Sequence, residues 1–241
     1  MRDRQCAAIR RREDRYRADT AAAVATLAYG AVLNRVLPEV VHVPASLTAA
    51  ATWLTAARRA GVSVAGLGLA PERLRAGARV GLVVGAPIVA GIAAASRVHA
   101  TSGYFDDARV RGATPRKVAY EAAVRIPIAT ALGEELIFRS ALLGLFRRKH
   151  STVTAVAASS LLFGVWHVLP TLESLARNPP ADGDHSVIHK LGVVAGTVAA
   201  TTAAGVGFSL LRLRSGSVLA PVIVHAAINS SAFIAARQGP R

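Results

Sequence analysis

The chain has 241 residues, of which 52% are hydrophobic, and its formal net charge is +15. Aromatic residues make up only 5% and do not interleave with a basic patch, so the charge does not indicate a nucleic-acid partner. Cys6 is the single cysteine, which excludes an intrachain disulfide and a cysteine-based metal site.

The distribution of charge indicates a membrane protein. Charged residues collect in short blocks, and the apolar runs between them are about 16–21 residues long, enough to cross a hydrocarbon core of roughly 30 Å. Arginines cluster at the ends of these runs, where cytoplasmic loops of membrane proteins place their basic residues. We therefore expect an all-α, polytopic integral membrane bundle of about six to eight membrane helices surrounded by a lipid bilayer.

The amino-terminal part divides into a tail and a first group of helices. Residues 1–19 are basic and without apolar periodicity, which predicts a solvated cytoplasmic tail. Residues 20–114 should contain the amino-terminal membrane helices and their connections. The expected helices are a first span at 20–37, a weaker one at 45–57, a short amphipathic surface helix near 71–79 and a clear span at 80–96.

A longer helix is expected after this group. Thr114 and Pro115 are typical of an N-cap followed by proline at the first helical position. A straight helix over 116–146 would be about 46 Å long, more than one span needs. It should therefore tilt, kink near Pro127 or Gly133, or break.

The remaining spans are bounded by helix-breaking residues and polar loops. One should cover 151–169 and end at Pro170, and two more should cover 190–211 and 217–236. The intervening loop contains Asp182, Asp184, His185 and His189, which we expect to be solvated rather than to form a metal site. Residues 115–236 thus form one core, and 237–241 are a tail.

Three sets of polar residues lie within these apolar runs. The first set is Glu134 and Glu135 with Arg139, the second is Phe163 with His167, and the third is His225 with Asn229. In each set two residues are four positions apart: Glu135 and Arg139, Phe163 and His167, and His225 and Asn229. Ionisable residues inside a bilayer cost a few kcal/mol each, so they are usually paired and functional. Glu135 shares a helix face with Arg139 and should pair with it. Glu134 is rotated by about 100° around the helix axis from Glu135, so its carboxylate is free to take part in a reaction.

These side chains suit acid–base chemistry. A carboxylate can act as a general base, imidazoles can orient water or donate protons, and an amide can hold an oxyanion. Individually, each histidine could be a packing residue and Asn229 could join two helices by a hydrogen bond. The joint occurrence on three apolar segments favours a functional site.

The ordered motifs resemble those of a known family. Glu134-Glu135-x-x-x-Arg139, Phe163-x-x-x-His167 and His225-x-x-x-Asn229 look like the signature of the CAAX prenyl endopeptidase type II and bacteriocin-processing family, the ABI or CPBP intramembrane proteases. The resemblance covers roughly residues 115–236.

The resemblance implies peptide-bond hydrolysis at a site buried between helices. Glu134 would activate water, His167 would help to position that water, and His225 and Asn229 would stabilise the tetrahedral oxyanion. Glu135, Arg139 and Phe163 would support the site.

Metal dependence stays open at this point. Glu134, His167 and His225 have the chemistry of a catalytic zinc site with two histidines and a glutamate. Glu135, however, would then have to act as the base, although it is expected to face Arg139. We favour a mechanism without a cofactor and keep zinc as the alternative.

Other functions and partners also remain open. A non-catalytic scaffold or immunity protein of the same family would keep these residues for packing, and a proton-coupled transporter would use Glu134 and the histidines as a relay. The expected partner is a membrane-anchored protein or peptide substrate, and the expected location is the cell membrane.

Overall fold

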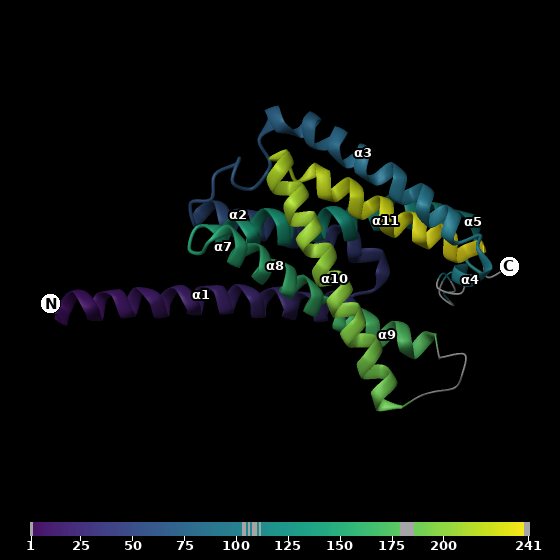
Figure 1. Ribbon diagram of the computed structural model, residues 1–241. Coiled ribbons are helices and arrows are strands. Elements are labelled where there is room, and N and C mark those ends of the chain that lie inside the picture. Colours follow the sequence, from purple (N-terminus) through teal and green to yellow (C-terminus); the bar gives the residue numbers. More distant parts are fainter. Residues whose placement is uncertain are drawn as a thin grey trace.

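The computed structural model describes residues 2–102, 105, 107, 110, 112–178 and 186–238, with side chains described from residue 18 to 237 of these ranges except at Ser102. The regular structure of this part of the chain is entirely helical (Figure 1). Three of the predicted loop residues, Asp182, Asp184 and His185, and the tail residues 239–241 lie outside the described residues.

The helices before residue 103 are α1, Arg2–Arg35; the 3₁₀ turn η1, Glu39–Val41; α2, His42–Arg59; α3, Pro71–Ala95; and the short α4, His99–Ser102. The helices from residue 115 onward begin with α5, Pro115–Tyr120; η3, Glu121–Leu132; α6, Gly133–Glu135; η4, Leu136–Leu142; and α7, Leu143–Arg147. They continue with α8, Thr152–Trp166; α9, Val168–Arg177; α10, Val187–Ser215; and α11, Leu219–Gln238.

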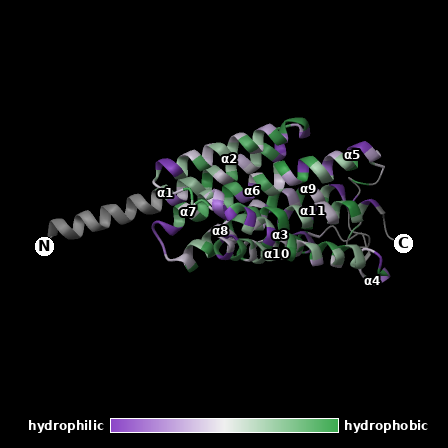
Figure 2. Ribbon diagram, turned by 90° about the horizontal axis from the view of Figure 1, so that it is seen from above, coloured by the Kyte–Doolittle hydropathy of each residue, from purple (hydrophilic) through white to green (hydrophobic). Residues whose placement is uncertain are grey.

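The predicted all-helical membrane bundle is confirmed, but with fewer candidate spans than the six to eight expected. Five helical segments of the described chain are long and apolar enough to cross a membrane: Glu39–Arg59, Pro71–Ala95, Thr152–Arg177, Val187–Ser215 and Leu219–Arg237. Neither the expected span at 20–37 nor the segment carrying the two glutamates is among them. Large apolar side chains are exposed along them, such as Val83 at 75% and Ile188 at 83%. Hydrophobic colours accordingly reach the outer faces of the helices in Figure 2, as lipid-facing surfaces require.

Two boundaries differ from the sequence-based expectation because no residue breaks the helix where a boundary was predicted. Helix α1 begins at Arg2 rather than near residue 20, and the first proline after it is Pro38. Residues 71–79 do not form a separate surface helix but are the first turns of α3, which starts with Pro71 at its first position.

The helix over 151–169 does not end at Pro170. It breaks three residues earlier, at His167, whose φ and ψ of −82° and −3° separate α8 from α9. Pro170 then falls in the first turn of α9, where the missing N–H has no intrahelical acceptor to lose.

The segment carrying the two glutamates is one helical path with irregular hydrogen bonding. Thr114 caps it as predicted, accepting from the backbone N–H of Lys117 at 3.2 Å. Pro127 and Gly133 do not break it. Instead η3 and η4 have the wider i→i+5 bonding of a π-helix on both sides of Gly133–Glu135, an arrangement often found at functional sites.

Small residues set how closely α3 and α11 approach. The two helices lie side by side (Figure 1), and the buried Gly77, Gly81 and Gly85 form one stripe on α3 at intervals of four residues. A Cβ added to Gly81 would lie 2.8 Å from Cβ of Ile223 on α11. This stripe therefore fixes the helix that carries His225 and Asn229.

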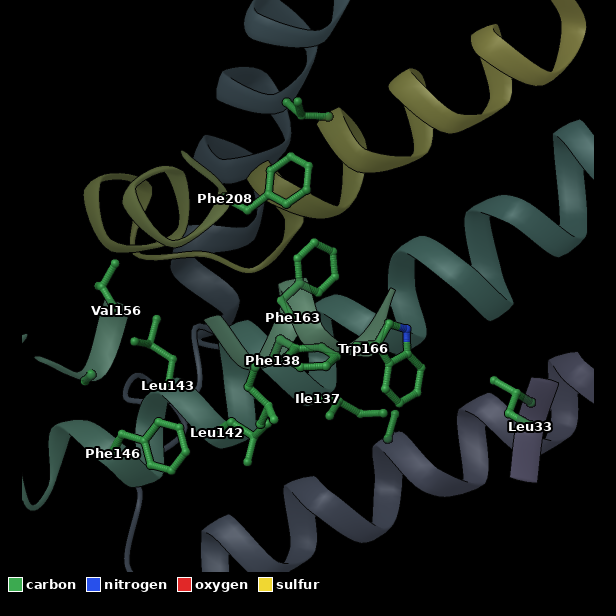
Figure 3. Close-up of a cluster of buried hydrophobic side chains, with 14 residues drawn as sticks. Leu33, Ile137, Phe138, Leu142, Leu143, Phe146, Val156, Phe163, Trp166 and Phe208 are labelled. Atoms are coloured by element: carbon green, nitrogen blue, oxygen red, sulfur yellow. The ribbon is translucent and has the colours of Figure 1, made fainter. Parts of the chain in front are cut away.

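The buried core surrounds the glutamate segment. Phe138, Phe163, Trp166 and Phe208 come from η4, α8 and α10 and meet in one cluster (Figure 3). Ring centroids of Phe138 lie 5.1 Å from Phe163 and 5.5 Å from Trp166, both edge to face. The aromatic cluster thus forms one wall of the polar residues described next.

Candidate active site

A buried charge cluster lies between α6, η4 and α11. Nη1 of Arg139 lies 3.2 Å from Oε1 of Glu135, and both side chains are fully buried. The same carboxylate oxygen is 3.0 Å from Nδ1 of His225, which is also buried. The predicted Glu135–Arg139 pair is therefore present, and His225 is its third member.

The guanidinium of Arg139 is enclosed by aromatic rings. Its Cζ lies 4.0 Å from the ring centroid of Phe163 and 5.2 Å from that of Phe208. A Cβ at Gly205 would come within 3.0 Å of Nη2, so this position on α10 needs a small residue to leave room for the guanidinium. Phe163 thus supports the arginine by a cation–π contact.

Glu134 points to different partners from its neighbour. Its Oε1 accepts a hydrogen bond of 3.2 Å from Nε1 of Trp166. Its Oε2 is buried, has no hydrogen-bond partner and lies 4.0 Å from Nε2 of His225. This separation is too long for a direct hydrogen bond, so Oε2 keeps its capacity to accept from another donor.

His225 therefore lies between the two glutamates. A carboxylate can only accept, so the 3.0 Å contact with Glu135 requires the proton of the neutral ring on Nδ1. Phe208 stacks on the imidazole at 5.1 Å with an interplanar angle of 21°. These contacts fix the ring plane and direct Nε2 toward Glu134.

His167 lies at the edge of this cluster. Its Nδ1 is 2.7 Å from the carbonyl oxygen of Phe163, which leaves Nε2 for another partner. The side chain is partly exposed at the break between α8 and α9, and the described residues show no hydrogen bond or ion pair between it and Glu134. The structure thus places His167 beside Trp166 rather than against the glutamate.

Asn229 lines a cavity of about 760 Å³ next to the cluster. It lies one turn beyond His225 on α11, and Thr130, one turn before Glu134, lines the same cavity. The rest of the lining includes charged residues of several helices, among them Glu39, Lys117, Glu121, Arg125, Glu173 and Arg177. The cavity therefore reaches the helical turns adjacent to Glu134 and His225, although neither of these two residues lines it.

The three residues of the zinc alternative are not grouped as ligands in this arrangement. Within the described part of the chain, no three His, Cys, Asp or Glu side chains lie together so that they could hold a metal ion. Nδ1 of His167 lies on a backbone carbonyl and Nδ1 of His225 lies on Glu135, contacts that zinc-binding histidines also make through the nitrogen that does not bind the metal. No step below is routed through a metal, and the mechanism without a cofactor stays a prediction.

Sequence reasoning missed two residues of this site. Trp166 could have been suspected, because an indole N–H inside an apolar span needs an acceptor. Phe208 gave no such signal, since it is one apolar residue among many on α10.

Comparison with known proteins identifies the region that contains all of these groups. A family model described as type II CAAX prenyl endopeptidase Rce1-like matches residues 118–231. Comparisons with curated proteins and with solved structures found no match. The matched region begins inside α5 and ends inside α11, so it includes Glu134, Trp166 and His225 but none of α1, α2 or α3.

Proposed function

We propose that the chain, which belongs to the Rce1-like family of type II CAAX prenyl endopeptidases through residues 118–231, hydrolyses a peptide bond of a membrane-associated protein or peptide. One observation carries the proposal: the unpartnered Oε2 of Glu134 lies 4.0 Å from Nε2 of His225. A carboxylate oxygen that can act as a base thus faces an imidazole nitrogen, and we place the attacking water beside these two groups.

Glu134 acts as the general base. Oε2 takes a proton from the bound water, and the resulting hydroxide attacks the carbonyl carbon of the scissile bond. The carbonyl π electrons move to oxygen and form a tetrahedral oxyanion. When the C–N bond breaks, the proton on Glu134 passes to the leaving amine, so water is divided between the new carboxyl and amine groups.

His225 stabilises the developing oxyanion. Glu135 holds Nδ1, so the ring needs no reorganisation to direct Nε2 at the new negative charge, and in its doubly protonated form the ring donates from Nε2. Asn229, on the same helix and at the wall of the cavity, supplies a second donor. His167 positions the water from the side of Trp166.

The substrate enters through the cavity beside Asn229. Its charged lining is suited to a polar, extended peptide segment, while the apolar outer faces of the helices keep the site in the bilayer. We assign the substrate to peptides or proteins anchored in, or processed at, the cell membrane. Nothing in the lining requires a prenyl group.

The test replaces Glu134 with glutamine in otherwise identical cells. Membrane and secreted peptides are compared by mass spectrometry between strains that carry the wild-type protein and Glu134→Gln. Accumulation of an uncleaved peptide in the variant strain is expected. The purified wild-type protein in lipid vesicles should then cleave that peptide, and Glu134→Gln should not.

The control is Glu72→Gln. Glu72 is exposed in the first turn of α3 and is not part of the cavity lining. This variant should cleave like the wild type. Full cleavage by Glu134→Gln would overturn the proposal, and identical peptide profiles in all strains would favour a scaffold or immunity protein. Loss of wild-type cleavage on metal chelation would support zinc instead.

A further inference from the structure

Trp166 makes the two carboxylate oxygens of Glu134 inequivalent, because it donates a hydrogen bond to only one of them. The indole is 5% exposed, and its N–H donates to Oε1 at 3.2 Å. Oε2 remains without a hydrogen-bond partner and faces His225. A free carboxylate can rotate and exchange its oxygens, so the hydrogen bond from the indole determines which oxygen faces His225.

The position of Trp166 depends on α1. A Cβ added to Gly30 would lie 2.6 Å from Cζ3 of the indole, so the backbone of α1 runs directly against the ring. The neighbouring Tyr29 packs on it with ring centroids 5.9 Å apart. Phe138 contacts the indole from the glutamate-bearing segment, 5.5 Å away, and Figure 3 shows Trp166 between this core and α1.

We propose that Trp166 is a positioning residue for Glu134, and that α1 sets the place of Trp166 through Gly30. The role of Glu134 as base is taken from the proposed function. Helix α1 lies outside the region that matches the family, residues 118–231, so the inference gives an amino-terminal segment a part in the geometry of the site.

The first experiment replaces Trp166 with phenylalanine. This keeps a ring against Gly30 and Phe138 but removes the donor, so Glu134 loses the contact that orients it. Misplacing a catalytic group by about 1 Å can cost on the order of 100-fold in rate. We expect kcat on the cleaved peptide to fall by about 10- to 100-fold while KM stays unchanged.

The matched control is Trp53→Phe, because Trp53 is the other tryptophan of the chain and lies on α2. It should leave kcat unchanged. An unchanged kcat in Trp166→Phe would overturn the positioning role.

The second experiment does not depend on cleavage. In the Trp53→Phe protein all indole fluorescence comes from Trp166, and a carboxylate accepting its N–H perturbs the emission. Adding Glu134→Gln removes that charge, so the emission maximum and yield should change, whereas adding Glu72→Gln should change neither. Identical spectra for the Glu134 and Glu72 variants would refute the contact, whatever the protein cleaves.

The third experiment tests α1. Gly30→Ala places a methyl group where the indole lies, so it should shift Trp166 emission and lower kcat in the same sense as Trp166→Phe. Gly91→Ala on α3 is the control, since a Cβ there meets nothing within 4 Å. A Gly30→Ala protein with unchanged emission and kcat would remove α1 from the inference. If the wild type cleaves no peptide, the proposed function fails. The two fluorescence measurements still test whether Trp166 contacts Glu134 and whether α1 sets the place of Trp166.

Discussion

Nδ1 of His225 on α11 lies 3.0 Å from Oε1 of Glu135 on α6, and the two residues are 90 positions apart in the chain. The second glutamate of the pair is therefore more than the partner of Arg139. It holds the imidazole that faces the first glutamate. Glu135 contacts Nδ1 of His225 and Glu134 faces Nε2 of the same ring. Removing one carboxylate should therefore affect stability and activity differently from removing the other.

Glu135→Gln should cost stability as well as activity. The substitution leaves the fully buried Arg139 without its counter-ion, and breaking a buried pair in this way costs about 3–5 kcal/mol. Thermal unfolding in detergent should show a large decrease in melting temperature. Glu134→Gln should change the free energy of unfolding by less than about 1 kcal/mol, since its amide oxygen can still accept from Trp166. Equal melting temperatures for Glu135→Gln and Glu134→Gln would contradict the structural role of Glu135 as the counter-ion of Arg139.

The double variant Glu135→Gln with Arg139→Met should recover part of that loss. It removes both charges, so no buried charge is left unpaired, and methionine can fill space beside Phe163. We expect the double variant to unfold at a higher temperature than Glu135→Gln alone while remaining inactive. Additive destabilisation in a double-mutant cycle would show that the two residues are not coupled.

The sequence indicated the helical class and the pairing of Glu135 with Arg139 because these depend on local patterns. Apolar runs of spanning length predict membrane helices, and the four-residue spacing of Glu135 and Arg139 brings them onto one face, where they do pair. Thr114 and Pro115 located a helix start for the same reason.

Contacts between distant segments were not predictable in this way. The hydrogen bond from Trp166 to Glu134 joins residues 32 positions apart, and no spacing rule relates them. The sequence pattern assigned Glu135 to Arg139 alone and left Glu134 for chemistry. The packing of α11 shows that Glu135 also contacts His225. The π-helical bonding around Gly133 likewise depends on how the segment packs, which a local pattern does not encode.

Asn229→Ala should affect the reaction and not the fold. Asn229 lies at the wall of the cavity, and removing one oxyanion donor costs about 100- to 1,000-fold in kcat. Ser231→Ala is the control, because Ser231 lies on the same helix, donates to the backbone carbonyl of Ala227 at 2.6 Å and is not part of the cavity lining. Single-turnover cleavage by the two variants measures the difference. Equal rates would remove Asn229 from the mechanism.

The close packing of α3 on α11 should allow a disulfide between them. A Cβ built on Gly85 lies 3.4 Å from Cβ of Ala227, close to the separation of about 3.5–4.5 Å found in disulfides. Gly85→Cys with Ala227→Cys, in a Cys6→Ser background, should therefore cross-link on mild oxidation. Mass spectrometry of the non-reduced protein detects the bond.

The control for this pair is Gly91→Cys with Ala227→Cys, since Gly91 faces open space on the same helix. It should stay reduced under the same conditions. Because α11 carries His225 and Asn229, the cross-linked protein should also retain cleavage if the observed packing is the active one. Cross-linking of the control, or failure of the Gly85 pair to cross-link, would contradict the placement of α3 against the helix that holds the proposed oxyanion donors.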